Sequence, residues 1–164
     1  VSGGFDLPAV TCTAPRVVPE LECSIVLVYT NVISELMRTE PSSLVLSWFG
    51  TQDASALFLS AITEAELRTG VSILPMGQRR ERLLAAIDAV IDEDFADRVL
   101  PFDSQAAKAY AGIAAARRAA GRPIADADCQ IAAIALGLGA GIATRNVKDF
   151  EGCGVQVINP WDAP

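Results

Sequence analysis

IVLVYTNVISEL, residues 25–36, begins with a run of Ile, Val and Leu, turns polar at Thr30 and Asn31, and continues with a helical pattern. A short apolar run of this kind is typical of a strand that is buried on both faces of a sheet. The last side chain of the strand is Tyr29, which would lie at the carboxyl end, where open parallel sheets bind their ligands. The stretch therefore predicts a buried strand that ends beside a polar site.

Segments typical of strands and of helices alternate along the rest of the chain. Further strands are expected at 56–62, 99–102, 141–144 and 155–158, and helices at 32–38, 41–50, 63–70, 78–95, 103–120 and 127–136. This alternation predicts an α/β fold in three layers, with helices on both faces of a central, mostly parallel sheet. The glycines of GLGAG, residues 137–141, follow a helix and precede a strand, so they indicate a helix stop and not a dinucleotide-binding loop.

Composition narrows the possible functions. The 164 residues are 51% hydrophobic, which suits one domain with its own core. The absence of histidine excludes Ser-His-Asp and Cys-His catalysis and mixed Cys/His zinc sites. Four scattered cysteines indicate reduced thiols in a cytoplasmic protein. The net charge of −7 argues against bulk attraction to nucleic acid but allows a local basic groove.

The two ends of the chain differ in character. Residues 1–24 contain three prolines, show no clear periodicity and lack the pattern of a signal peptide. We interpret them as a non-native or loosely ordered extension, and expect one folded domain at 25–164. No apolar run approaches the roughly 18 residues that a membrane-spanning helix needs, so no membrane association is expected.

Polar side chains are predicted to converge at the carboxyl edge of the sheet. They come from four places, each at a strand end or near the start of a helix: Tyr29, Thr30 and Asn31; Glu66; Asp126 and Asp128; and Arg145, Asn146 and Asp149. Carboxylates without histidine suit Mg²⁺, or Mn²⁺ in its place, because these ions prefer oxygen ligands.

Each acidic residue also has a purely structural interpretation. Glu66 could complete a capping box with Thr63, Asp126 could be a helix N-cap, and Asp149 could be a turn residue. Asp128 could simply favour the positive end of a helix dipole. The arginines at 79, 80 and 82 could contact a phosphate backbone or only form a solvated helix face.

Five segments together resemble the PIN-domain family, specifically the VapC/FitB-like toxins of bacterial toxin–antitoxin pairs. They are IVLVYTNVISELMR (25–38), LSAITEAELRTG (59–70), VLPFDSQAAKAYAGI (99–113), GRPIADADCQIAAIALG (121–137) and ATRNVKDFEGCGVQVINPW (143–161). The resemblance implies a parallel sheet flanked by helices, a homodimer, and a magnesium-dependent ribonuclease site of three or four acidic residues. It also implies a cognate antitoxin that occludes the site, and RNA as the substrate.

Position by position, the resemblance assigns the second and third acidic residues, both metal ligands, to Glu66 and Asp128. The fourth position falls on Asn146, with Asp149 nearby. Thr30 and Asn31 match the polar pair that positions the family's site, and Arg68 and Arg145 are expected to contact the substrate.

Tyr29 departs from the family pattern, which reads V-D-T-N and uses that aspartate as a central metal ligand. A phenol titrates near pH 10, so Tyr29 offers one neutral oxygen at pH 7. We therefore expect a ribonuclease toxin that Tyr29 disarms. The alternative is a non-catalytic PIN-like module that binds an antitoxin or nucleic acid. A phosphatase of the aspartyl-phosphate type is disfavoured because its nucleophilic aspartate after the first strand is missing.

Overall fold

The computed structural model describes residues 25–162, so the expected extension at 1–24 lies outside the described residues. Five short strands form one sheet in the order β3-β2-β1-β4-β5, and every pairing between them is parallel. The strands are β1 (Val26–Val28), β2 (Leu57–Ser60), β3 (Val99–Leu100), β4 (Gly141–Ala143) and β5 (Val157–Ile158). The predicted α/β architecture with a parallel sheet is confirmed.

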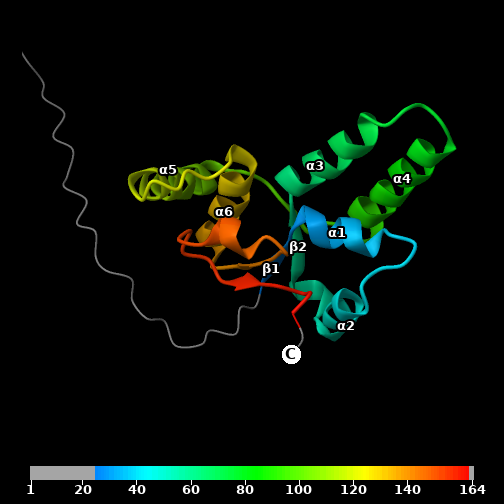
Figure 1. Cartoon of the computed structure of the whole chain (residues 1–164), viewed down its shortest axis with the longest axis horizontal. Coiled ribbons are helices and arrows are strands. Elements are labelled where there is room, and N and C mark those ends of the chain that lie inside the picture. Colours follow the sequence, from blue (N-terminus) through cyan, green and yellow to red (C-terminus); the bar gives the residue numbers. More distant parts are fainter. Residues whose placement is uncertain (1–24, 163–164) are drawn as a thin grey trace, which may run out of the picture.

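Six α-helices connect and cover these strands. They are α1 (Thr30–Leu36), α2 (Ser43–Thr51), α3 (Ala61–Ser72), α4 (Gln78–Ala89), α5 (Ser104–Ala119) and α6 (Asp126–Leu138). Three short helical turns complete the described part: η1 (Ala54–Ala56), η2 (Val90–Asp94) and η3 (Val147–Phe150). Helices α3 and α4 lie side by side and extend together away from the sheet (Figure 1).

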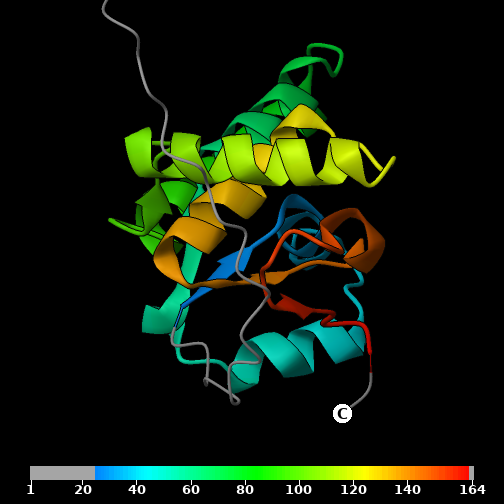
Figure 2. The same cartoon turned by 90° about the vertical axis from the view of Figure 1, so that its left-hand side faces the viewer.

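The sheet separates two apolar clusters, as strand alternation requires. Val26 and Val28 of β1 belong to the cluster that α1, α2, α3 and α4 cover. Leu27, between them, belongs to the cluster that α5, α6 and η3 cover on the opposite face. Figure 2 shows α5 and α6 on one side of the sheet and α2 on the other. The three predicted layers are therefore present.

The predicted boundary between β2 and α3 was wrong, because Ser60 and not Thr63 caps the helix. The Ser60 hydroxyl accepts a hydrogen bond from the Thr63 backbone N–H at 2.9 Å, so α3 begins at Ala61. Glu66 consequently lies beyond the first turn and is no member of a capping box. The helix also runs past Gly70 to Ser72.

Several other boundaries differ from the predictions: α1 begins at Thr30 and not at 32, α2 covers Ser43–Thr51 and not 41–50, and β5 is shorter than 155–158. The helix expected over 78–95 is α-helical only to Ala89 and ends in the π-helical turn η2. Ala125, not Asp126, is the N-cap of α6. The predicted glycine stop is confirmed, since Gly139 caps α6 at a φ of 63°, a left-handed conformation that suits glycine.

Within residues 25–162 no helix is long and apolar enough to cross a membrane. Cys129 and Cys153, the two cysteines of this part of the chain, are free and buried. Burial raises the pKa of the Cys129 thiol to about 11.

Candidate functional site

The carboxyl ends of β1 and β4 open into a hollow of about 600 Å³, here called the site hollow. Helices α1 and α3, the segment after β4 and the segment after β5 supply its walls. Its lining residues are Tyr29, Thr30, Asn31, Ser34, Glu35, Arg38, Glu66, Arg145 and Trp161. Five predicted site residues, Tyr29, Thr30, Asn31, Glu66 and Arg145, thus share one cavity.

Tyr29 joins β1 to the start of α6. Its hydroxyl donates a hydrogen bond to Asp128 Oδ1 at 2.6 Å, and its ring packs edge-on against Phe150 with the centroids 5.5 Å apart. Burial, the hydrogen bond to Asp128 and the nearby carboxylates of Glu66 and Asp149 raise the pKa of Tyr29 well above its usual value. The phenol is therefore neutral at pH 7 and occupies one oxygen of Asp128.

Thr30 forms the matching contact with Glu66. Its hydroxyl donates to Glu66 Oε2, which links the first residue of α1 to α3. The residues at the end of β1 and the start of α1 thus bind two carboxylates through two neighbouring hydroxyls. Glu66 is held by this contact, and it faces the hollow from the side of α3.

Asn31 connects the ends of β1 and β4. Its side-chain amide donates to Thr144 Oγ1 at 3.1 Å, and its carbonyl oxygen accepts from the Arg145 backbone N–H at 3.3 Å. The same Thr144 hydroxyl accepts from the Asn146 backbone N–H at 3.1 Å. Thr144 is fully buried, so this group fixes the loop after β4 relative to β1.

The other predicted site residues of the segment after β4 lie next to this group. Asn146 directly precedes η3, and Asp149 lies within that turn. The Asp149 carboxylate is close enough to raise the pKa of Tyr29. Asp126, which was considered as an auxiliary acid, instead accepts a hydrogen bond from the Tyr110 hydroxyl at 3.0 Å.

The residues present do not fit a divalent metal ion. Within residues 25–162 no group of three or more His, Cys, Asp or Glu side chains is arranged to hold a metal. Asp128 has one oxygen bonded to Tyr29, and Glu66 has one bonded to Thr30. A magnesium ion needs several oxygen ligands in octahedral order, and a neutral phenol beside two such carboxylates does not supply them.

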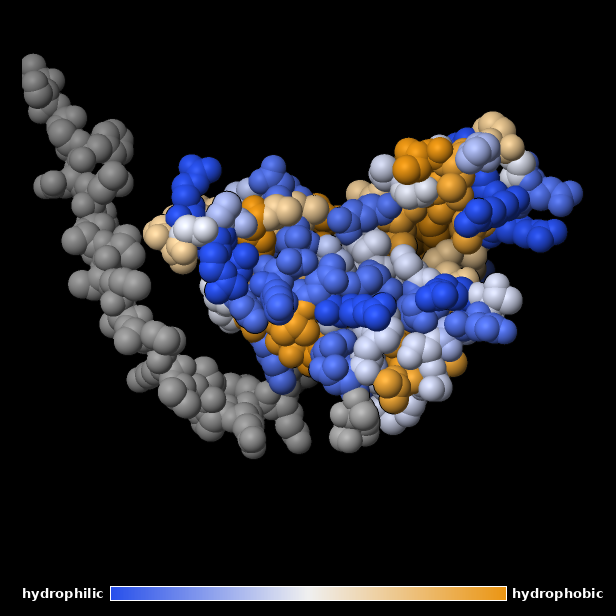
Figure 3. All heavy atoms as spheres, in the orientation of Figure 1, coloured by the Kyte–Doolittle hydropathy of each residue, from blue (hydrophilic) through white to orange (hydrophobic). Residues whose placement is uncertain are grey.

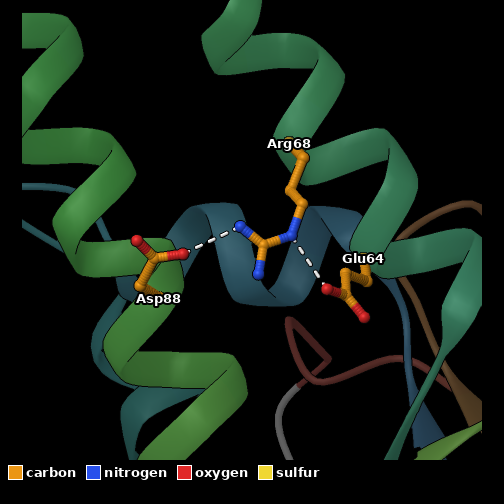
Figure 4. A network of polar contacts seen from close by, with 3 residues as sticks. All are labelled: Glu64, Arg68 and Asp88. Carbon is orange, nitrogen blue, oxygen red and sulfur yellow. Dashed lines mark hydrogen bonds and ion pairs between the residues drawn. The ribbon is translucent and has the colours of Figure 1, made fainter.

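Arg68 is the predicted substrate contact that lies apart from the site hollow. Its guanidinium is held between Glu64 of α3 and Asp88 of α4, with both nitrogen–oxygen distances at 2.8 Å (Figure 4). The pair with Asp88 ties α3 to α4, and the pair with Glu64 lies within α3. Arg145, in contrast, lines the hollow, and its Cζ lies 5.4 Å from the centroid of the Trp161 ring.

Sequence reasoning missed Ser34, Glu35, Arg38 and Trp161 as lining residues. Ser34 and Glu35 follow Asn31 on α1 at i+3 and i+4, and Arg38 lies at i+7 just beyond the end of the helix, so helical spacing was a usable signal. Glu35 Oε1 accepts the Ser42 backbone N–H at 2.8 Å, and this bond, followed by the hydrogen bond from Arg38, lowers the pKa of Glu35. Trp161 offered no local signal, because strand pairing alone brings it to the site.

A second, larger hollow of about 1210 Å³ continues from the first between α1 and the α3–α4 pair, and is here called the helix groove. The two share Thr30, Ser34, Arg38 and Glu66. Arg79 and Arg82 add positive charge to its lining. Much of the lining is apolar and consists of Met37, Leu67, Val71, Leu74, Leu83 and Ile87. Figure 3 shows apolar side chains gathered over the α3–α4 pair.

Comparison with known proteins places this architecture in a family. The plasmid stability protein StbB of Pseudomonas syringae pv. tomato is 47% identical over 138 residues, covering 84% of this chain and 99% of that protein. The VapC ribonuclease Y4jK of Sinorhizobium fredii is 44% identical, covering 81% of this chain and 95% of the relative. The crystal structure of FitAcB from Neisseria gonorrhoeae superimposes with a TM-score of 0.80 at 40% identity, covering 85% of this chain and all of that one.

The similarity extends over nearly the whole described domain. Residues 26–151 match the PIN domain, from the first residue of β1 to just beyond η3. This range holds every predicted site residue, and only Trp161 of the site hollow lies outside it. The chain therefore belongs to the PIN-domain family, among relatives of the VapC and FitB proteins.

Proposed function

We propose that this chain is the ribonuclease toxin of a toxin–antitoxin pair, built to hydrolyse RNA phosphodiester bonds with Mg²⁺ or Mn²⁺, and that Tyr29 disarms it. Family membership and the named ribonuclease and toxin relatives support the nuclease class. The hydrogen bond from Tyr29 to Asp128 carries the second half of the proposal, because it places a neutral phenol against the carboxylate that the resemblance assigns to the metal.

Tyr29 gives the site less negative charge than an aspartate at the same position would. A phenolate at position 29 is disfavoured by burial and by the surrounding carboxylates, so Tyr29 contributes no negative charge near pH 7. An aspartate there would add a third carboxylate beside Asp128 and Glu66. Three close carboxylates repel one another without a cation and bind one readily, which is the logic of oxygen-rich divalent sites.

The helix groove supports an antitoxin as the partner. Its apolar lining suits the apolar face of a peptide segment, and its continuity with the site hollow at Glu66 would let that segment reach the catalytic position. FitB of Neisseria gonorrhoeae is named a toxin, and the similar solved structures include FitAB bound to a DNA fragment and VapBC-1 of Haemophilus influenzae. A homodimer in the cytoplasm, as the resemblance implies, is part of this proposal.

The same tyrosine favours one alternative, a non-catalytic PIN module that retains its antitoxin or nucleic-acid surfaces. In that case the Tyr29–Asp128 contact is the working state of the protein, and restoring a carboxylate would not produce a nuclease. The two proposed functions predict different results for the Tyr29→Asp substitution, which therefore tests between them.

The experiment compares Mn²⁺ binding by calorimetry and RNA cleavage in the chain as it stands, Tyr29→Asp and Tyr29→Asn. The asparagine variant matches the aspartate in size and lacks its charge. We expect metal binding and cleavage only with Tyr29→Asp, and their loss when Asp128→Asn is added. Adding Asp126→Asn instead is the matched control and should leave both intact. A Tyr29→Asp variant that binds Mn²⁺ yet leaves all RNAs whole would refute the ribonuclease.

A further inference from the structure

Arg145 and Trp161 lie next to each other because they follow neighbouring parallel strands. Strands β4 and β5 are paired with Ala143 opposite Ile158, and the Thr144 N–H extends the pairing to the Ile158 carbonyl at 2.9 Å. The chain then leaves both strands at the same edge of the sheet. Arg145 and Trp161 are thereby placed together on the wall of the site hollow.

Trp161 is supported by hydrogen bonds in its turn and by the apolar cluster against which its ring packs. The Trp161 backbone N–H donates to Asn159 Oδ1 at 3.1 Å, and the Asn159 amide donates to Asp162 Oδ1 at 3.0 Å, so the turn after β5 is internally bonded. The indole packs against the apolar cluster on the α1–α4 side of the sheet. The partly buried ring is therefore a platform supported by the apolar cluster.

The Arg145 guanidinium rests on this platform. Its Cζ is 5.4 Å from the ring centroid, within the range of a cation–π interaction. Its backbone is also fixed, because the N–H donates to Asn31. Among the described residues Arg145 takes part in none of the ion pairs, and the nearby Glu35 carboxylate is already bonded to Ser42 and Arg38. The donors of the guanidinium therefore remain available to a ligand.

We propose that Trp161 is a positioning residue that holds Arg145 at the rim of the site hollow, where the guanidinium binds a phosphate of single-stranded RNA. The identity of the ligand rests on the proposed function. The planar fork of five N–H donors matches a phosphate in two parallel bonds, and stacking on the indole orders the fork in advance. The hollow is lined by two cations and two carboxylates, and Arg38 is ion-paired with Glu35, so Arg145 is the lining cation that no ion pair of the described residues holds and that can meet a phosphate.

The test measures the affinity of the full chain for a short fluorescein-labelled single-stranded RNA over a salt series, which Tyr29 allows without cleavage. Arg145→Gln should weaken binding about 5-fold to 10-fold at about 50 mM salt and reduce the slope of log affinity against log salt by about 0.7. Arg118→Gln, an exposed arginine on α5 away from the hollow, is the matched control and should change neither.

The positioning role is tested by coupling. Trp161→Leu should weaken binding about 2-fold to 5-fold when Arg145 is present, and Trp161→Phe should keep most of the affinity. In the Arg145→Gln background Trp161→Leu should have no further effect, since a positioning residue acts only through its partner. Thermal unfolding of each variant separates this effect from a loss of stability, which would appear in both backgrounds.

An equal effect of Trp161→Leu with and without Arg145 would overturn the positioning role, and an unchanged salt slope in Arg145→Gln would overturn the phosphate contact. If no form of the chain binds the RNA, the inference also fails, while cleavage by Tyr29→Asp would still support the proposed nuclease. If the coupling is found but Tyr29→Asp does not cleave, the inference stands and the nuclease does not.

Discussion

The Tyr29→Phe substitution tests the contact on which the interpretation of the site depends. It removes one hydroxyl and leaves the ring packed edge-on against Phe150. The lost bond joins Tyr29 to a charged acceptor at 2.6 Å, and such bonds contribute about 1.5 to 3 kcal/mol when they are fully buried. Since both residues are only partly buried, water restores part of this loss, and we expect a cost of about 1 kcal/mol at about pH 8.

The effect of Tyr29→Phe should depend on pH, with a sign set by the raised pKa of Tyr29. A raised pKa in the folded state stabilises the protein fully below the unfolded-state pKa of about 10, and this stabilisation is lost as pH rises toward the folded-state value. At about pH 11, ionisation of Tyr29 in the unfolded chain alone favours unfolding by about 1.4 kcal/mol. The phenylalanine variant has no phenol to ionise, so at about pH 11 its free energy of unfolding should equal or exceed that of the parent.

Urea denaturation of both proteins at the two pH values measures the difference directly, because other alkaline titrations cancel between them. Tyr110→Phe is the matched control, since it removes a tyrosine–aspartate bond of 3.0 Å that is exposed, and should change the free energy of unfolding at about pH 8 much less than Tyr29→Phe does. A stability difference for Tyr29→Phe that is near zero and independent of pH would refute the Tyr29–Asp128 bond and the closed site with it.

Two further predictions concern the helices that carry the site. Ser60→Ala removes the N-cap of α3 and leaves the buried Thr63 N–H without its acceptor, so the free energy of unfolding should fall by about 1 to 2 kcal/mol in urea titrations, whereas the exposed Ser72→Ala should have little effect. Arg68→Met breaks two partly exposed ion pairs, one within α3 to Glu64 and one from α3 to Asp88 of α4, so it should cost under about 1 kcal/mol at low salt and less at high salt; a loss that salt does not change would mean that packing and not charge is what Arg68 supplies.

The architecture was predictable from sequence because strands buried on both faces are recognisable as short apolar runs. Val26, Leu27 and Val28 are apolar on both faces, and the structure divides them between two clusters as a covered parallel sheet requires. Helix starts were less predictable. Ser60 and Thr63 are both good capping residues, and only the folded backbone decides that Ser60 accepts the hydrogen bond.

The site was predictable to the extent that strand ends define it. The rule that ligands bind at carboxyl ends selected Tyr29, Thr30, Asn31 and Arg145, which do share the site hollow. Arg68 was assigned to the substrate from sequence, but in the structure it lies apart from the site hollow. Residues two apart on a helix face nearly opposite sides, so Glu66 in the hollow already directs Arg68 away from it, toward α4.

At the junction of β1 and α1, two neighbouring hydroxyls bind two carboxylates of the candidate site. Glu66 and Asp128 come from helices on opposite faces of the sheet, and each is met by a hydroxyl, from Thr30 and Tyr29 respectively. Two adjacent residues thus supply hydrogen bonds where an oxygen-rich site would otherwise need a cation to offset its charge. Under the proposed function, Tyr29 therefore does more than replace a ligand. Together with Thr30 it completes a bonded arrangement that a metal ion would have to disrupt, so restoring the carboxylate, and not adding more metal, is the change expected to open the site.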